Sequence, residues 1–77
     1  MEKLSKQHII NIATDIYKDT FGQEPDEIRC VICKDIVQLY ILPHKYIFQF
    51  DDIHINSATS FANALLPALA EKKRLFK

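Results

Sequence analysis

Residues 28–50 read IRCVICKDIVQLYILPHKYIFQF, and this stretch decides the fold. Apolar residues recur in it with a period of two, which is typical of β-strands. We predict three antiparallel strands in a meander, with turns at residues 34–35 and 43–44. The implied cross-strand pairs are Ile32–Val37, Cys30–Leu39, Ile28–Ile41, Ile41–Tyr46, Leu39–Phe48 and Val37–Phe50. A slip of one residue at either turn would scatter these apolar side chains over both faces of the sheet.

The predicted register sorts the side chains into two faces. One face is apolar, and it carries Ile28, Cys30, Ile32, Val37, Leu39, Ile41, Tyr46, Phe48 and Phe50. The opposite face carries Arg29, Val31, Cys33, Ile36, Gln38, Tyr40, Leu42, Lys45, Ile47 and Gln49. We expect the first face to be buried against helices. The second is more apolar than a solvated face needs to be.

The residues before the strands have the spacing of an amphipathic helix over positions 5–21. Ser5 is a suitable N-cap, because its hydroxyl can accept a bond from a backbone N–H of the first turn. Gly22, the only glycine, stands where helices often end in a left-handed residue, and Pro25 prevents continuation. The sequence therefore predicts one helix that stops at Gly22.

A second amphipathic helix is predicted after the strands. Candidate caps are Asn56, Ser57, Thr59 and Ser60, and the apolar stripe is Phe61, Ala62, Leu65, Leu69 and Phe76. Pro67 lacks a backbone N–H, so we expect a kink or a break there. The segment 53–56 fits either a fourth strand or a loop. The fold class is thus α+β, a single domain over residues 1–77 with two layers: helix, a three- or four-stranded antiparallel meander, and helix.

Length and composition limit the function. The 77 residues allow one small core, and 48% hydrophobic with 26% charged residues is typical of a globular chain. Ten basic residues balance ten acidic ones, so the overall positive field of a nucleic-acid-binding protein is lacking. No apolar stretch approaches the roughly 20 residues of a membrane span, and no signal peptide follows Met1. We expect a cytoplasmic protein with reduced cysteines.

The cysteines and histidines raise the question of a redox or metal site. Cys30 and Cys33 have the spacing of thioredoxin-like motifs, but on a strand they lie about 10 Å apart and point to opposite faces. Together with His44 and His54 they match the ligand types of a zinc site, yet a strand pair cannot chelate through both sulfurs. We therefore expect no cofactor and no metal, with Cys30 buried and Cys33 accessible.

Neither catalysis nor nucleic-acid binding is strongly indicated. Residues 51–52 are adjacent aspartates near His54, but acids at a turn are usually solvated, so we predict no enzymatic activity and no catalytic residue. The C-terminus is basic, with Lys72, Lys73, Arg74 and Lys77. These charges suit the C-terminal end of a helix dipole. The alternative is a small nucleic-acid-binding module that uses this basic helix, assisted by Arg29 and Lys45.

Part of the chain resembles a known family. Residues 22–29, GQEPDEIR, followed by Ile32 and by DIV at residues 35–37, resemble the opening of the MpsC-like family in residue type and spacing. These small bacterial domains are linked by name to a sodium-translocating system that generates a membrane potential. The likeness covers residues 9–42 and ends before residues 43–45. It implies a helix that leads into a hairpin, and it implies no active-site residue.

The sequence favours a non-enzymatic protein–protein interaction or accessory domain whose cellular role it does not name. Its predicted interaction surface is the apolar part of the second sheet face, formed by Val31, Ile36, Tyr40, Leu42 and Ile47. These residues alternate out of the core on three neighbouring strands and would form one patch. We expect a homodimer through this patch, because a two-fold axis lets one surface serve both copies, or else a different protein partner.

Overall fold

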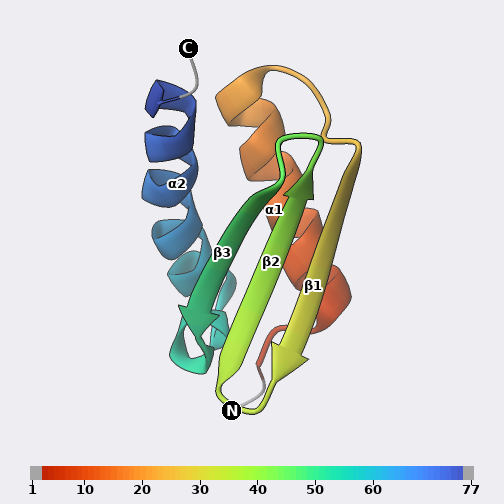
Figure 1. Ribbon diagram of the computed structural model, residues 1–77. Helices are drawn as coiled ribbons and strands as arrows, with labels where there is room; N and C mark the ends of the chain where they lie inside the picture. Colours follow the sequence, from red (N-terminus) through yellow and green to blue (C-terminus); the bar gives the residue numbers. More distant parts are fainter. Residues whose placement is uncertain (1–2, 76–77) are drawn as a thin grey trace.

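The computed structural model describes residues 3–75 and shows two helices with an antiparallel sheet between them in the chain (Figure 1). The elements are α1 (Lys6–Phe21), β1 (Glu27–Cys33), β2 (Ile36–Leu42), β3 (Tyr46–Asp51), the 3-10 helix η1 (Asp52–Ile55) and α2 (Ala58–Leu75). This is the predicted α+β order. No helix in residues 3–75 combines the length and the apolar character needed to cross a membrane.

The sheet has the strand order β1-β2-β3 and the predicted register. All six predicted cross-strand pairs are present, from Ile32–Val37 to Ile41–Tyr46. The first turn is the predicted two-residue one, and Lys34 adopts a left-handed φ of 52° there. The second turn is longer than predicted. It extends to Lys45, which has a φ of 61°.

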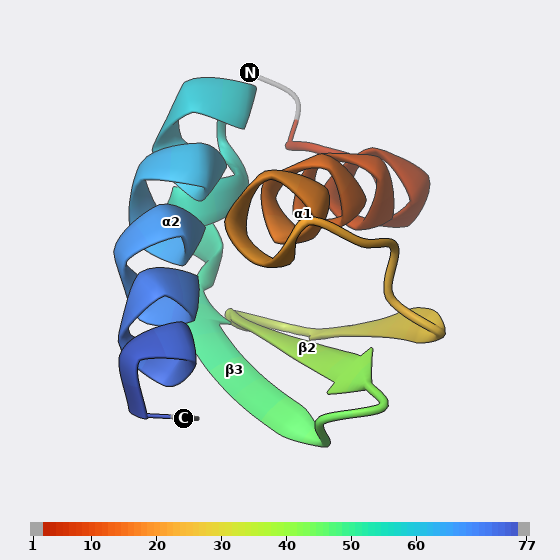
Figure 2. The ribbon, with the colours of Figure 1, turned by 90° about the horizontal axis from the view of Figure 1, so that it is seen from above.

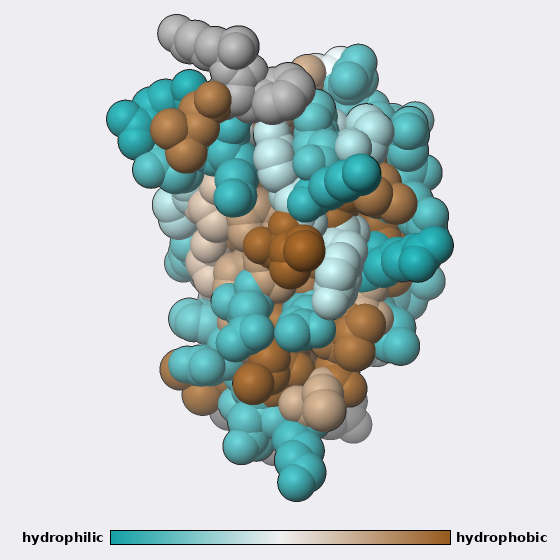
Figure 3. All heavy atoms as spheres, in the orientation of Figure 1, coloured by the Kyte–Doolittle hydropathy of each residue, from teal (hydrophilic) through white to brown (hydrophobic). Residues whose placement is uncertain are grey.

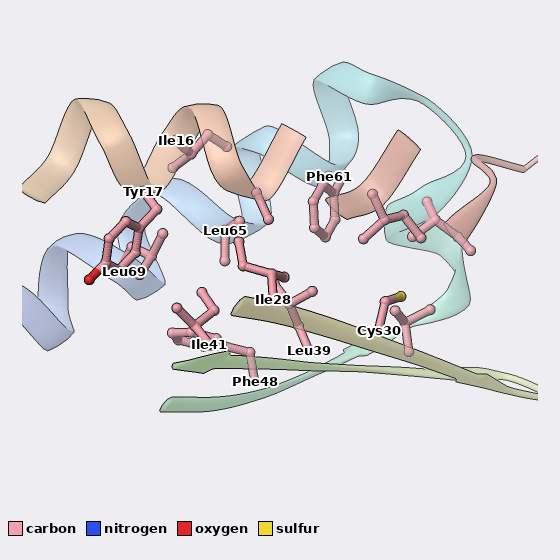
Figure 4. Close-up of a cluster of buried hydrophobic side chains, with 14 residues drawn as sticks. Ile16, Tyr17, Ile28, Cys30, Leu39, Ile41, Phe48, Phe61, Leu65 and Leu69 are labelled. Atoms are coloured by element: carbon pink, nitrogen blue, oxygen red, sulfur yellow. The ribbon is translucent and has the colours of Figure 1, made fainter. Parts of the chain in front are cut away.

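Both helices lie on the same side of the sheet, as the view from above shows (Figure 2). They bury one hydrophobic core against it (Figure 4). The core residues are Ile9, Ala13, Ile16, Tyr17, Ile28, Cys30, Val37, Leu39, Ile41, Phe48, Ile55, Phe61, Leu65 and Leu69. We call the sheet face that packs on the helices the helix side and the opposite face the open face.

One residue of the predicted buried face is not buried. Ile32 points to the helix side but keeps 40% of its surface exposed, because it lies near the hairpin end of β1, an edge strand. Tyr46 and Phe50 are half-buried, and both pack against the core. The expectation of burial was therefore wrong for Ile32.

The ends of α1 are those that the sequence predicts. The Ser5 Oγ accepts a hydrogen bond of 3.1 Å from the backbone N–H of His8. Gly22 has a φ of 78°, and its N–H donates to the carbonyl oxygen of Lys18 at 2.8 Å. A left-handed glycine thus ends the helix, and the chain turns back toward the sheet.

The C-terminal part resolves two open questions. Residues 52–55 form η1 and not a fourth strand, so the sheet has three strands in the described part of the chain. Ile55 is buried and Ile53 is exposed.

Ser57 is the cap of α2, since its Oγ accepts a bond of 3.1 Å from the N–H of Ser60. The helix does not break at Pro67 but continues to Leu75. Phe76 lies outside the described residues.

Candidate interaction surface

The open face carries all five residues of the predicted interaction surface. The register places its side chains in cross-strand rows: Glu27–Leu42, Arg29–Tyr40–Ile47, Val31–Gln38–Gln49 and Cys33–Ile36–Asp51. Ile47 and Val31 are 60% and 46% exposed, and Ile36 is also exposed. Tyr40 and Leu42 are half-buried by their neighbours on the sheet. No helix covers this face in the described part of the chain (Figure 2).

Two polar side chains, Gln38 and Gln49, interrupt this apolar surface, and we call this pair the polar row. The Gln38 Nε2 donates to the Gln49 Oε1 at 3.4 Å, and the Tyr40 Oη donates to the Gln38 Oε1 at 3.1 Å. Figure 3 looks onto the open face and shows hydrophobic side chains separated by hydrophilic ones. The five residues therefore share a face on which polar side chains lie among them. The sequence held the signal, because the predicted register already set Gln38 opposite Gln49.

Two charged side chains of the open face, Glu27 and Arg29, lie on β1. The Arg29 Nε donates to the Glu27 Oε2 at 2.8 Å. This hydrogen bond and the negative charge of Glu27 raise the pKa of Arg29. Both side chains are exposed, so the ion pair contributes little to stability. It does neutralise one of the two cations that we considered as phosphate contacts on the sheet.

The two cysteines point to opposite faces of β1. Cys30 is buried on the helix side, and Cys33 is exposed on the open face. Burial raises the pKa of the Cys30 thiol, and the nearby charge of Lys6 lowers it to a smaller extent. A raised thiol pKa is the opposite of what a reactive thiolate needs. In residues 3–75 no three side chains among His, Cys, Asp and Glu are grouped to hold a metal ion.

The histidines lie in aromatic contacts. His44 stacks on Tyr46 and on Phe21, with ring centroids 4.9 and 5.3 Å apart. His54 meets the ring of Phe50 edge-on, with centroids 6.2 Å apart. The first cluster joins the C-terminal end of α1 to the β2–β3 turn and to β3. It also holds Tyr17, whose pKa is raised by burial first and then by Tyr46 and Asp26.

The basic residues of α2 make contacts within the chain. The Lys72 Nζ lies 5.7 Å from the centre of the Tyr46 ring, a cation–π contact. The Lys73 Nζ donates to the carbonyl oxygen of Thr20 at 2.7 Å, near the end of α1. The Arg74 Nε donates to Glu71 at 3.1 Å. The two lysines therefore connect α2 to β3 and to the end of α1. Lys77 lies outside the described residues.

The adjacent aspartates end β3 and begin η1. Asp52 forms an ion pair with Lys3, and its N–H donates to the carbonyl oxygen of Asp35 at 2.8 Å. Asp51 and His54 lie in the same short segment. Asp51 is exposed, whereas His54 is half-buried against Phe50. The contacts of Asp52 attach the N-terminal residues and the β1–β2 turn to η1.

The chain matches no known protein-family model, no curated protein and no solved structure. The resemblance of residues 9–42 to the MpsC-like family therefore stays a prediction.

Proposed function

We propose that this chain is a non-enzymatic, cytoplasmic protein-interaction domain that contacts a partner protein through the open face. One observation carries the proposal: both helices pack on one side of the sheet, so the other side is left uncovered although it holds Val31, Ile36 and Ile47. Exposed apolar side chains that recur on one face often mark interaction sites.

The polar row favours a different protein over a second copy of this chain as the occupant. Two sheets pack face to face when both inner faces supply apolar side chains that interdigitate. Here a two-fold face-to-face contact would bury Gln38 and Gln49 of both copies, and polar groups that lose water without a partner cost free energy. A partner with hydrogen-bonding groups opposite this row and apolar groups on either side fits better. Non-obligate interfaces have this mixed character.

The nucleic-acid alternative has less support. Lys72, Lys73 and Arg74 contact Tyr46, Thr20 and Glu71, and phosphate binding would have to compete with these contacts. Arg29 is paired with Glu27. The formal net charge of the sequence is zero, so no long-range attraction would compensate.

The test is quantitative affinity capture with open-face variants. Tyr40→Lys and Ile47→Lys add a charge to the open face, and Ile53→Lys is the matched control, because Ile53 is an equally exposed isoleucine on η1. Circular dichroism first establishes that each variant is folded. We expect at least one captured protein to be lost by both open-face variants and retained by the control. Calorimetry with that purified protein should then show Kd raised at least about 10-fold by either variant.

Two outcomes would contradict the proposal. If every captured protein binds wild type, Tyr40→Lys and Ile47→Lys equally, the open face is not the docking surface. If instead wild type sediments as a dimer and Tyr40→Lys as a folded monomer, the occupant of the open face is a second copy of the chain, as the sequence analysis expects.

A further inference from the structure

The two outer edges of the sheet have different surroundings. Strand order β1-β2-β3 leaves the backbone hydrogen-bonding groups of β1 and β3 unpaired on one side each. Figures 1 and 2 both show α2 beside β3 on its outer side. At β1 the nearest described element is α1, which packs against the strand from the helix side, and Figure 2 shows nothing beside the outer edge of β1 in line with the sheet. An added strand would meet α2 at β3, whereas at β1 it would lie below α1.

The β1 edge lacks the features that usually prevent strand pairing. Edge strands are commonly protected by proline, lysine, bulges or short length. β1 spans seven residues, EIRCVIC, with neither proline nor lysine, and its two charges pair with one another. Its second half is apolar on both faces, because Val31 points to the open face and Ile32 to the helix side. These residues are 46% and 40% exposed.

We propose that β1 pairs antiparallel with β1 of a second copy of this chain, across a two-fold axis at Cys30, so that two three-stranded sheets become one sheet of six strands. This inference goes beyond the proposed function, since it uses the edge of the sheet and leaves the open face free. Backbone N–H and C=O groups supply the attraction, as in other cases of strand addition.

The charges around β1 select the register. With the axis at Cys30, all seven residues of β1 pair, and Asp26, just before the strand, comes next to the turn residue Lys34 of the second copy at both ends. Moving the axis to Arg29 sets Arg29 opposite Arg29. Moving it to Val31 brings Glu27 next to the turn residue Asp35 of the second copy. Like charges opposite or next to one another are destabilising, so both neighbouring registers are disfavoured.

The selected register also covers the exposed isoleucine. Ile32 lies opposite Ile28 of the second copy on the helix side, and this pair occurs twice. On the open face, Val31 lies opposite Arg29 of the second copy. An axis perpendicular to the sheet keeps both open faces on one side. The dimer therefore presents two copies of the partner surface next to each other.

The first test measures self-association by sedimentation equilibrium. Ile32→Lys places a lysine on the β1 edge at an exposed position, and Ile53→Lys is the control. We expect wild type and the control to dimerise with the same Kd, and Ile32→Lys to raise Kd at least about 10-fold. Tyr40→Lys should leave the dimer intact, because Tyr40 faces the open side of the central strand. A wild type that stays monomeric up to millimolar concentration overturns the proposal, and so does a dimer that only Tyr40→Lys weakens.

The second test reads the register and does not depend on Ile32. Glu27→Cys in a Cys30→Ala background lies opposite the native Cys33 of the second copy in the proposed pairing. Within one chain, positions 27 and 33 are about 20 Å apart, too far for a disulfide. Mild oxidation should give a covalent dimer with two disulfides. The control, Gln49→Cys in the same background, should crosslink at least about 10-fold more slowly, since Gln49 lies on β3. Equal crosslinking of both variants contradicts the register.

The charge pair provides a third readout. Lys34→Asp brings a carboxylate next to Asp26 twice per dimer and should raise the Kd of the dimer. The double variant Asp26→Lys, Lys34→Asp restores opposite charges and should recover the wild-type Kd to within about threefold. Aspartate accepts the left-handed backbone of position 34, so folding is preserved. If the double variant is as weak as the single one, these two residues do not face each other.

Discussion

The same three strands present two faces that differ in what covers them, although both carry large apolar side chains. Val37 and Val31 lie on adjacent strands, yet Val37 is fully buried and Val31 is exposed. Leu39 and Tyr40 are neighbours in sequence and lie on opposite faces. The difference shows that burial in this protein is decided by the position of the helices. An apolar residue on the open face is available for binding because no part of residues 3–75 reaches it.

The largest expected difference between the faces is in stability. Leu39→Ala removes a fully buried side chain of the central strand and should lower the free energy of unfolding by about 3 kcal/mol. Ile47→Ala, on the open face, should change it by less than about 0.5 kcal/mol. Urea unfolding followed by circular dichroism measures both. Similar losses for the two variants would mean that the open face is covered in solution.

The two cysteines of β1 allow the buried and the open face to be compared within one strand. Cys33 should react with a thiol reagent at the rate of an exposed thiol, whereas Cys30 reacts only when the core opens. We expect Cys30 to be at least about 100-fold slower, which corresponds to an opening free energy near 3 kcal/mol. Mass spectrometry of the native protein at successive times identifies the labelled site. Faster labelling of Cys30 would mean that the register is shifted by one residue.

Alkaline pH should lower the stability of the fold through the buried thiol of Cys30. Burial raises the pKa of Cys30 above the ordinary 9.0, so the folded state favours the neutral thiol. Its contribution to stability is present below pH 9 and is lost as the pH rises through the folded pKa, with a slope of at most about 1.4 kcal/mol per pH unit. Urea unfolding between pH 8 and about 10 should show this slope in wild type and Cys33→Ala, and a smaller one in Cys30→Ala. An unchanged slope in Cys30→Ala would assign the effect elsewhere.

The smallest expected effect concerns the polar row. Gln38→Leu removes two side-chain hydrogen bonds on a half-solvated face and should change stability by less than about 1 kcal/mol. It also joins the apolar groups on either side of the row. If the row limits face-to-face contact, Gln38→Leu should increase self-association in sedimentation experiments, while Gln49→Glu should not. A Gln38→Leu variant with the wild-type association constant would show that the row has no such role.

The register and the ends of α1 were predictable because each rests on several local signals that agree. One alignment of the strands gathers the apolar residues on one face, and the alternatives disperse them. Ser5 and Gly22 stand at the two ends of a clear helical period. The open-face residues followed from the register alone. These residues are exposed because both helices pack on the other side of the sheet.

The open questions and the error at Ile32 arose where local signals are ambiguous or where tertiary packing decides. Residues 53–56 hold two isoleucines two apart, which fits a strand as well as a short helix. Pro67 costs α2 one backbone hydrogen bond, and packing on the same helix outweighs that loss. The exposure of Ile32 depends on how far the helices extend along β1. The predicted register already placed Gln38 among the apolar residues of the open face. A prediction based on the apolar residues alone does not take Gln38 into account.

The position of α2 beside β3 has a consequence for how far sheet pairing can proceed. Open sheet edges are templates on which further chains add without limit, and this is the route to fibrils. Here α2 lies beside the β3 edge, whereas Figure 2 shows no described element beside the β1 edge in line with the sheet. Once two copies have joined at β1, both remaining edges are β3 edges, and each has α2 beside it. We therefore expect the proposed pairing to stop after one step, because α2 stands beside the edge that would have to continue it.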